Sequence, residues 1–296
     1  MVDHGRVIHP SSPSEPGRAA DGGVPLPSRR QVIVGAAAAL VLAGCGGDDG
    51  ASPTTTAVDG DTTASSSTST TTAGATTTIP PEACVLSPEL TAGPYHLDGH
   101  LARADITEGR PGVPLEFRVK VLALPDCTPL EGAAVDVWHC DAGGEYSGFE
   151  GNSLGATQAG GTNDERFLRG VQLTDVDGVA TFTTIFPGWY EGRTVHIHLQ
   201  VLEGGTLADT YAGGHVAHVG QAFFDEDLTA DLMATGAYAA RTGNRLTNEE
   251  DSIFGQGGSG TITTLTAVGS DPTDGYVGEF TCMVDPEATP DPAPLF

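Results

Sequence analysis

Basic residues are scarce in this chain. Its 296 residues include 13 Lys and Arg against 39 Asp and Glu, a formal net charge of −26. Without a basic face the chain cannot neutralise phosphates, which argues against nucleic acid or an anionic lipid surface as a partner. Long apolar runs are also lacking, since none reaches the roughly 20 residues of a membrane-spanning helix. With 41 Gly and 20 Pro, the composition indicates a soluble acidic domain rich in turns.

Cysteines are few and none form a close pair. The absence of any C-x-x-C spacing argues against a metal site built from cysteines. An even number of cysteines in an exported domain favours disulfides, but four cysteines allow three pairings and the sequence does not choose among them. Cys140, which falls within a predicted strand, can equally remain a buried thiol. The four cysteines of the predicted domain are Cys84, Cys127, Cys140 and Cys282.

The N-terminal region is predicted to direct export. Residues 1–44 contain Arg29 and Arg30 before an Ala-rich apolar stretch, as in a twin-arginine signal. The stretch ends at Leu-Ala-Gly-Cys45, which resembles a bacterial lipobox; the alternative is an ordinary secretory signal with an incidental cysteine. We therefore expect an exported protein, anchored at the outer face of the cell membrane by a lipid on Cys45, or secreted.

Two further segments are predicted to flank the domain rather than belong to it. Residues 45–81 are almost wholly Thr, Ser, Ala, Gly and Asp, and cannot bury enough apolar surface to offset their ordering entropy. They are interpreted as a disordered tether, and residues 287–296 as a Pro-rich tail. This leaves residues 82–286 as the folded domain.

The domain has the pattern of an all-β fold. Short alternating or β-rich segments recur between turn residues, which favours a β-sandwich core with long loops over alternating strands and helices. Asp175–Gly178 is predicted to form a hairpin turn, and only residues 225–240 suggest a helix. The predicted strands are 115–124, 133–140, 169–174, 179–186, 193–202, 219–224, 260–268 and 276–284.

A His-x-His pair is the first candidate for chemistry. In a strand, side chains two residues apart point to the same face, so His196 and His198 would stand side by side and could bind one metal ion. A regular strand would place Arg193 on the opposite face. Such a pair is weak evidence by itself, because it also occurs without a metal.

Two tyrosines lie in turns close to predicted strands. Pro187-Gly188 sets a turn before Tyr190, and a Gly-rich turn after the strand at 133–140 carries Tyr146. A third cluster contains Thr91-Ala-Gly-Pro-Tyr95. Tyr95 and Trp138 could line a pocket or belong to the core.

Taken in order, these clusters resemble the intradiol ring-cleavage dioxygenases, and in particular their exported single-domain branch. The resemblance implies an Fe(3+) ion, no organic cofactor, and cleavage of a catechol by O2 between its hydroxyl-bearing carbons to a cis,cis-muconate. It also implies that Arg193 and Gln221 assist catalysis beside the iron. Its implied ligands are Tyr146, Tyr190, His196 and His198, with Tyr190 also acting in catalysis. The segments that carry the resemblance are TxGPY, RxDIxEGxPGxPL, VxVWHCDAxGxYSG and PGWYxGRxxHIH.

Two other functions are compatible with the pattern. A non-catalytic exported β-sandwich module would keep the fold alone, and a zinc hydrolase would use His196 and His198 with a carboxylate; both leave the tyrosines without a role. The net charge favours neutral catechols as substrates. The oligomeric state is left open. His215 and His218 are predicted to form a solvated loop pair, and His96 and His139 are not expected to be ligands.

Overall fold

The computed structural model describes residues 84–99, 101–150 and 161–293. The predicted export signal at 1–44 and tether at 45–81 lie outside the described residues, as do the last three positions of the predicted tail. Within the described ranges, no helix combines the length and the apolar character required to cross a membrane.

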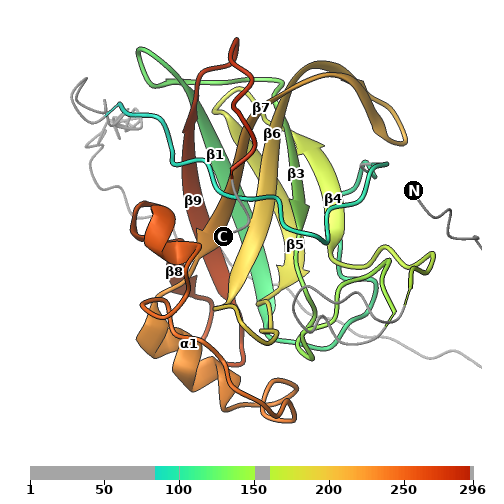
Figure 1. The fold of residues 1–296 in the computed structure, drawn as a ribbon, viewed down its shortest axis with the longest axis vertical. Helices are drawn as coiled ribbons and strands as arrows, with labels where there is room; N and C mark the ends of the chain where they lie inside the picture. The colour runs from blue at the N-terminus through green and yellow to red at the C-terminus, as the bar shows by residue number, and fades with distance from the viewer. Residues whose placement is uncertain (1–83, 100, 151–160, 294–296) are drawn as a thin grey trace, which may run out of the picture. The chain divides into compact units, whose positions relative to one another are not determined.

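The described residues form a sandwich of two β-sheets, which confirms the predicted all-β class (Figure 1). In the first sheet β1 pairs in parallel with β9 and antiparallel with β5 and β2, while β8 extends it beyond β9. The second sheet has the antiparallel order β4-β3-β6-β7. The strands are β1 Pro114–Ala123, β2 Thr128–Pro129, β3 Ala134–Trp138, β4 Arg169–Leu173, β5 Val179–Ile185, β6 His196–Leu207, β7 Tyr211–Phe223, β8 Thr264–Ala267 and β9 Tyr276–Val284.

Alternating apolar residues account for the core between the sheets. In β1, every second side chain from Leu115 onward is buried, and β9 alternates in the same way from Tyr276. Because side chains along a strand point to opposite faces, each strand contributes one apolar row to the interior. Phenylalanines in this core come from three strands of the first sheet: Phe117 on β1, Phe182 on β5 and Phe280 on β9.

Strand β6 differs because both of its faces are buried over its first seven residues. Ile197, Leu199 and Val201 belong to the apolar core. The alternate residues His196 and His198 face away from that core and are nevertheless 2% and 0% exposed. Other parts of the chain must therefore cover this polar face.

Residues 84–95, here called the N-terminal strap, contribute to that cover. Figure 1 shows this segment crossing in front of β6 and β7. Leu90 N donates to Val219 O at 2.9 Å, and Gln221 Nε2 donates to Thr91 O at 2.8 Å, so the strap is bonded to β7. Because β7 is the last strand of its sheet, the strap also satisfies part of an otherwise open edge.

The turn at Asp175–Gly178 forms, but it does not make the predicted hairpin. Gly178 N donates to Asp175 O at 2.9 Å, and Gly178 adopts φ +75°. The strands on either side belong to different sheets, since β4 pairs with β3 and β5 pairs with β1. The turn therefore carries the chain from one layer to the other, a choice that local turn chemistry does not determine.

Two predicted elements are shorter in the structure. Helix α1, Glu226–Met233, begins after the N-cap Asp225 and ends well before residue 240, because Gly236 follows with φ +50°. It lies at one end of the sandwich (Figure 1). The predicted strand at 260–268 is reduced to β8, because its first residue belongs to the short 3₁₀ turn η3, Gly258–Gly260, which follows η2, Phe254–Gln256.

The structure shows which cysteines of the domain are paired. Cys84 and Cys127, which are 43 residues apart in the sequence, form a disulfide. Cys140 and Cys282 are buried free thiols. The disulfide joins the beginning of the N-terminal strap to the loop between β1 and β2.

We expect replacement of both Cys84 and Cys127 by Ser to lower the free energy of unfolding by about 2–4 kcal/mol, because the cross-link restricts the unfolded chain. Urea denaturation with and without a reductant measures this. The reductant should lower the midpoint of the wild type and leave the double variant unchanged. Equal effects on both proteins would show that this disulfide does not contribute.

Candidate active site

The centre of the site is a row of side chains on the polar face of the second sheet. His198 pairs in register with Trp138 of β3 and with Gln221 of β7, so the three residues project from neighbouring strands to the same face. The Trp138 and His198 rings stack with centroids 5.1 Å apart and an interplanar angle of 1°. Trp138 thus packs directly against the site.

The two histidines bring their Nε2 atoms together. These atoms are 3.1 Å apart, and Tyr190 Oη lies 3.4 Å from His196 Nε2. His196 Nδ1 lies 2.7 Å from Thr194 O; this contact fits a proton on Nδ1 and leaves a lone pair on Nε2. A backbone carbonyl that holds one ring nitrogen in this way fixes the orientation of the imidazole and leaves the other nitrogen able to bind a metal ion.

The tyrosines reach the site from two loops that pack tightly against each other. Tyr146 follows β3 and Tyr190 precedes β6, and their ring centroids are 5.6 Å apart. A Cβ at Gly188 would collide with the carbonyl oxygen of Asp141, so glycine is required where the loops meet. The buried Tyr146 hydroxyl has no hydrogen-bond partner among the described residues.

Tyr95 of the N-terminal strap packs on both tyrosines. Its ring stacks on Tyr146 at 4.6 Å and meets Tyr190 edge-on at 5.7 Å. With Trp138 and Cys140, these three tyrosines form a buried cluster beside the histidines. Tyr95 and Trp138 are therefore both core residues and neighbours of the site, which removes the choice that the sequence left open.

Burial keeps the four candidate ligands uncharged in the absence of a cation. It raises the pKa of Tyr146 well above its ordinary value, and it raises that of Tyr190 to about 12 despite the opposing charge of Arg193. Burial lowers the pKa of His196 well below its ordinary value, reinforced by Arg193, and lowers that of His198 likewise, reinforced by His196. Two neutral imidazoles and two phenols thus meet in a space shielded from water.

Arg193 lies on the same side as the histidines, contrary to the expectation from strand alternation. Its Nη1 is 3.4 Å from His196 Nε2 and 3.5 Å from Tyr190 Oη, and its Nη2 donates to Gln221 Oε1 at 2.5 Å. The expectation assumed a strand from residue 193, whereas β6 begins only at His196. The turn before β6 lets the guanidinium swing into the site.

Asp251 also belongs to the site, although the sequence did not predict it. Its fully buried carboxylate accepts from Arg193 Nε at 2.8 Å and from Thr194 N at 2.8 Å. Asp251 lies in an irregular segment between α1 and η2, where no periodic pattern distinguishes it from neighbouring acidic residues. No signal in the single sequence could have identified it.

Among the described residues, the other histidines do not join the facing Nε2 atoms of His196 and His198. His215 and His218 belong to β7, not to a solvated loop: the register of β7 opposite β6 turns His218 inward, where its Nδ1 meets Glu89 Oε1 at 2.5 Å. His139 has contacts at both ring nitrogens, with Cys140 O at 2.8 Å and Thr184 Oγ1 at 2.7 Å. His96 lies 3.4 Å from the Asp136 carboxylate.

The donor set distinguishes between the metal sites considered above. Across the described ranges, no group of three or more His, Cys, Asp or Glu residues could hold a metal, so the carboxylate of the zinc hydrolase reading is not found there. Two phenol oxygens and two imidazole nitrogens are instead a predominantly hard set that suits Fe(III). The orphaned Tyr146 hydroxyl and the two facing Nε2 atoms fit such an ion.

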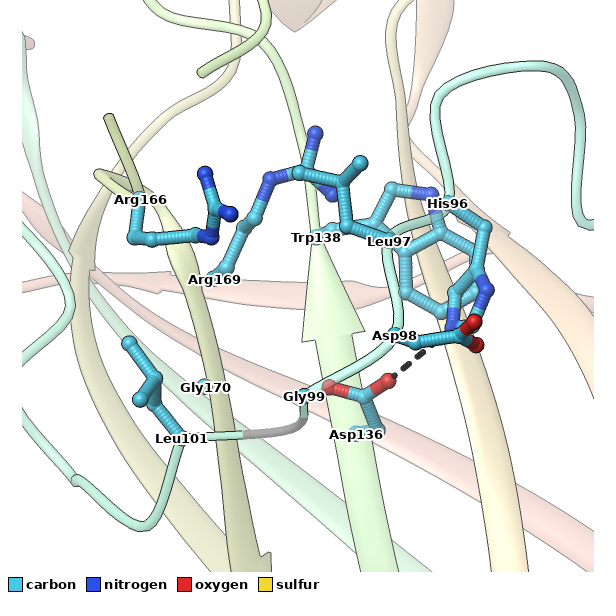
Figure 2. Close-up of a pocket in the computed structure, with 10 residues that line it drawn as sticks. All are labelled: His96, Leu97, Asp98, Gly99, Leu101, Asp136, Trp138, Arg166, Arg169 and Gly170. Carbon is cyan, nitrogen blue, oxygen red and sulfur yellow. Dashed lines mark hydrogen bonds and ion pairs between the residues drawn. The ribbon is translucent and has the colours of Figure 1, made fainter. Parts of the chain in front are cut away.

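A small cavity adjoins this cluster at Trp138 (Figure 2). Its volume of about 20 Å³ suits a single water molecule, so it is too small for an aromatic diol. Figure 2 shows Arg166 and Arg169 on one side of it and the His96–Asp136 pair on another. Arg169 donates to Ser147 Oγ and O, each at 2.8 Å, and so fixes the residue next to Tyr146.

Comparison with known proteins agrees with this geometry. A family model described as "Dioxygenase" matches residues 86–236, just over half of the chain. A solved structure of an intradiol ring-cleavage dioxygenase from Tetranychus urticae is 32% identical, with a TM-score of 0.61 over 71% of this chain and 98% of that one. The chain belongs to the intradiol ring-cleavage dioxygenases. A second dioxygenase of known structure is 34% identical to it, with a TM-score of 0.60 over 70% of this chain and 98% of that one.

Membership of this family makes the chain an oxidoreductase that opens catechol-type rings, and it confirms the resemblance seen in the sequence. It therefore favours the ring-cleaving enzyme over the alternative of a non-catalytic module. No curated protein matches the dioxygenase.

We expect Gly93→Ala to destabilise the dioxygenase more than Gly109→Ala. Both glycines have left-handed backbones, φ +68° and +73°, so alanine costs each about 1 kcal/mol in strain. Only at Gly93 does the added Cβ meet a neighbour, at 3.1 Å from His198 Cε1. Urea denaturation of the two variants measures the difference, and equal losses would show that the strap does not press on His198.

Proposed function

We propose that this dioxygenase uses Fe(III), held by Tyr146, Tyr190, His196 and His198, to cleave neutral catechols with O2 to cis,cis-muconates. The observation that carries the proposal is the convergence of these four side chains in one buried space, with the histidine Nε2 atoms 3.1 Å apart and Tyr190 Oη 3.4 Å from one of them. Bound iron would supply the positive charge that ionises the phenols and would activate the catechol toward O2.

The side chains around the four ligands have separable tasks. Arg193 directs Nη1 toward Tyr190 and His196, where its fixed charge would stabilise negative charge that develops on the substrate ring. Gln221 donates to Thr91 O and accepts from Arg193 Nη2, and so helps to fix the position of the guanidinium. Tyr190 Oη, next to that guanidinium, is the atom we assign to accept a proton from a substrate hydroxyl.

The surroundings favour an uncharged catechol. Arg193 binds Asp251 and Gln221 through Nε and Nη2 and directs Nη1 to Tyr190 and His196, so its guanidinium is aimed at the reacting end of a substrate and not at a separate carboxylate. The formal net charge of −26 would further disfavour anionic substrates. Neutral catechols and related uncharged diols are therefore the proposed substrate class.

Oxygen uptake by the iron-loaded enzyme with a panel of catechols tests the reaction. We expect each mole of O2 consumed to yield one mole of a cis,cis-muconate, with higher kcat/KM for neutral catechols than for protocatechuate.

Absorption spectra of variants test the tyrosine ligands. Tyr146→Phe and Tyr190→Phe should each shift or abolish a visible phenolate-to-iron absorption band, whereas Tyr211→Phe, at the start of β7, should retain it. The proposal would be contradicted if the ring-opened products carried aldehyde groups, which indicate cleavage beside the two hydroxyl-bearing carbons and not between them. It would also be contradicted if the iron-loaded wild type lacked the visible band.

We also propose that the enzyme is exported and tethered to the membrane by a lipid on Cys45. The lipobox-like sequence supports this, and so does the Cys84–Cys127 disulfide, because such bonds persist mainly in oxidising compartments.

Mass spectrometry of the protein purified from bacterial membranes tests the anchor. A mature N-terminus at Cys45 carrying acyl chains is the expected result. Cys45→Ser should move the protein to the soluble fraction, while Cys140→Ser, which affects a buried thiol, should not. An unmodified N-terminus at another residue would refute the anchor and leave the proposed reaction untouched.

A further inference from the structure

Asp251 makes an unusually complete set of hydrogen bonds for a buried carboxylate. Its Oδ2 accepts from Arg193 Nε and Thr194 N, both at 2.8 Å. Its Oδ1 accepts from Ile253 N at 2.8 Å and Phe254 N at 3.1 Å. The side chain is 0% exposed. One carboxylate therefore joins the segment that enters η2 to the residues immediately before β6.

The same contact determines the orientation of the Arg193 guanidinium. A guanidinium is planar and rigid, so holding Nε against Asp251 directs the two Nη atoms to the opposite side. There Nη2 donates to Gln221 Oε1 at 2.5 Å, and Nη1 lies within 3.5 Å of both Tyr190 Oη and His196 Nε2. Within the described residues, the Asp251 side chain makes no hydrogen bond or ion pair with any of the four proposed ligands, so its influence on them passes through Arg193.

Electrostatics also require a partner for Arg193. Its side chain is only 13% exposed, and a buried charge without a counterion is strongly destabilising. Beside a bound cation, an unpaired guanidinium would also be repelled from the site. The Asp251 carboxylate opposes both effects from the far side of the guanidinium, where it does not compete with a substrate.

We propose that Asp251 is a positioning residue that holds Arg193 in its active orientation. The inference rests on the proposed function, because Arg193 is assigned its electrostatic role there. Asp251 does not touch the substrate; its contribution is to keep Nη1 and Nη2 aimed at Tyr190 and Gln221. Without it, Arg193 would turn toward solvent and its stabilising charge would be lost from the reaction.

A double-mutant cycle tests this with Asp251→Asn, Arg193→Ala and the combined variant, all loaded with iron. Asparagine keeps the size of the side chain but cannot accept at both oxygen positions. We expect Asp251→Asn to lower kcat by about 10- to 100-fold, the range typical of lost outer-shell partners, with a smaller change in KM. In the Arg193→Ala background the same substitution should change kcat by less than about threefold, because the side chain that Asp251 orients is absent.

Two further readouts separate positioning from general damage. Asp225→Asn is the matched control: Asp225 caps α1 by accepting from Leu228 N at 3.1 Å and, in the described part of the chain, makes no hydrogen bond or ion pair with Arg193. It should lose well under about 1 kcal/mol of stability, because asparagine caps a helix nearly as well as aspartate, and it should keep the wild-type kcat. A crystal structure of metal-free Asp251→Asn should show the Arg193 guanidinium turned away from Gln221.

The outcomes that overturn the inference are distinct from failure of the proposed function. Wild-type kcat in Asp251→Asn, additive losses in the cycle, or an unmoved Arg193 in the metal-free crystal would each refute the positioning role. If the wild type itself neither binds iron nor opens catechols, the proposed function fails. The orientation of Arg193 in the metal-free variant then still decides whether Asp251 holds it.

Discussion

Alternation along β6 is the constraint on which the site depends. One row of its side chains, including Ile197 and Leu199, packs into the apolar core and fixes the strand in place. The other row, including His196 and His198, is then directed to the opposite face without freedom to slip, because a shift of one residue would exchange the two rows. The apolar interior therefore sets the position of the imidazoles as firmly as their own contacts do.

Cover over that second face comes from loops and from the N-terminal strap. Tyr146 and Tyr190 approach in two loops whose close packing requires Gly188, and Tyr95 of the strap closes over both rings. Burial makes every one of these groups costly to ionise, as the raised tyrosine and lowered histidine pKa values show. A site of this kind is neutral by itself and acquires charge from what it binds.

Arg193 is the charged exception, and its arrangement shows how a dry site tolerates a cation. Asp251 and Gln221 share its hydrogen bonds, so the guanidinium is neutralised on one edge and remains available on the other. The loop segment between α1 and η2 thus belongs to the site as much as β6 does. A polar network of this type is stable only when all of its members are paired.

Local patterns in the sequence were sufficient to predict the all-β class and most strands, because side chains alternate with a period of two residues along β1, β6 and β9. The same alternation placed His196 and His198 on one face. Tyr146 and Tyr190 were predicted as ligands because the sequence resembles the intradiol dioxygenases. Family membership confirms the resemblance, while the role of the two tyrosines as ligands stays a prediction. Their convergence depends on how two loops pack, which no local pattern describes.

Other features depended on long-range contacts. The position of Arg193 followed from where β6 begins, and the burial of His218 followed from the extension of β7 along a glycine-rich stretch that composition alone suggests is a loop. Asp251 became visible only through its partners. The pairing of Cys84 with Cys127 likewise required the fold, because spacing leaves three choices open.

The position of that disulfide has a mechanical consequence. Cys84 is the first described residue, and it is joined covalently to the loop after β1 before the chain continues toward Thr91 and Tyr95. A pulling force applied upstream of Cys84 would pass through the sulfur bridge into the five-stranded sheet. The hydrogen bonds of Leu90 and Thr91, and the aromatic contacts of Tyr95, would carry little of that load. In an enzyme attached to a surface by its N-terminus, the disulfide would thus keep tension on the chain from separating the N-terminal strap from the site.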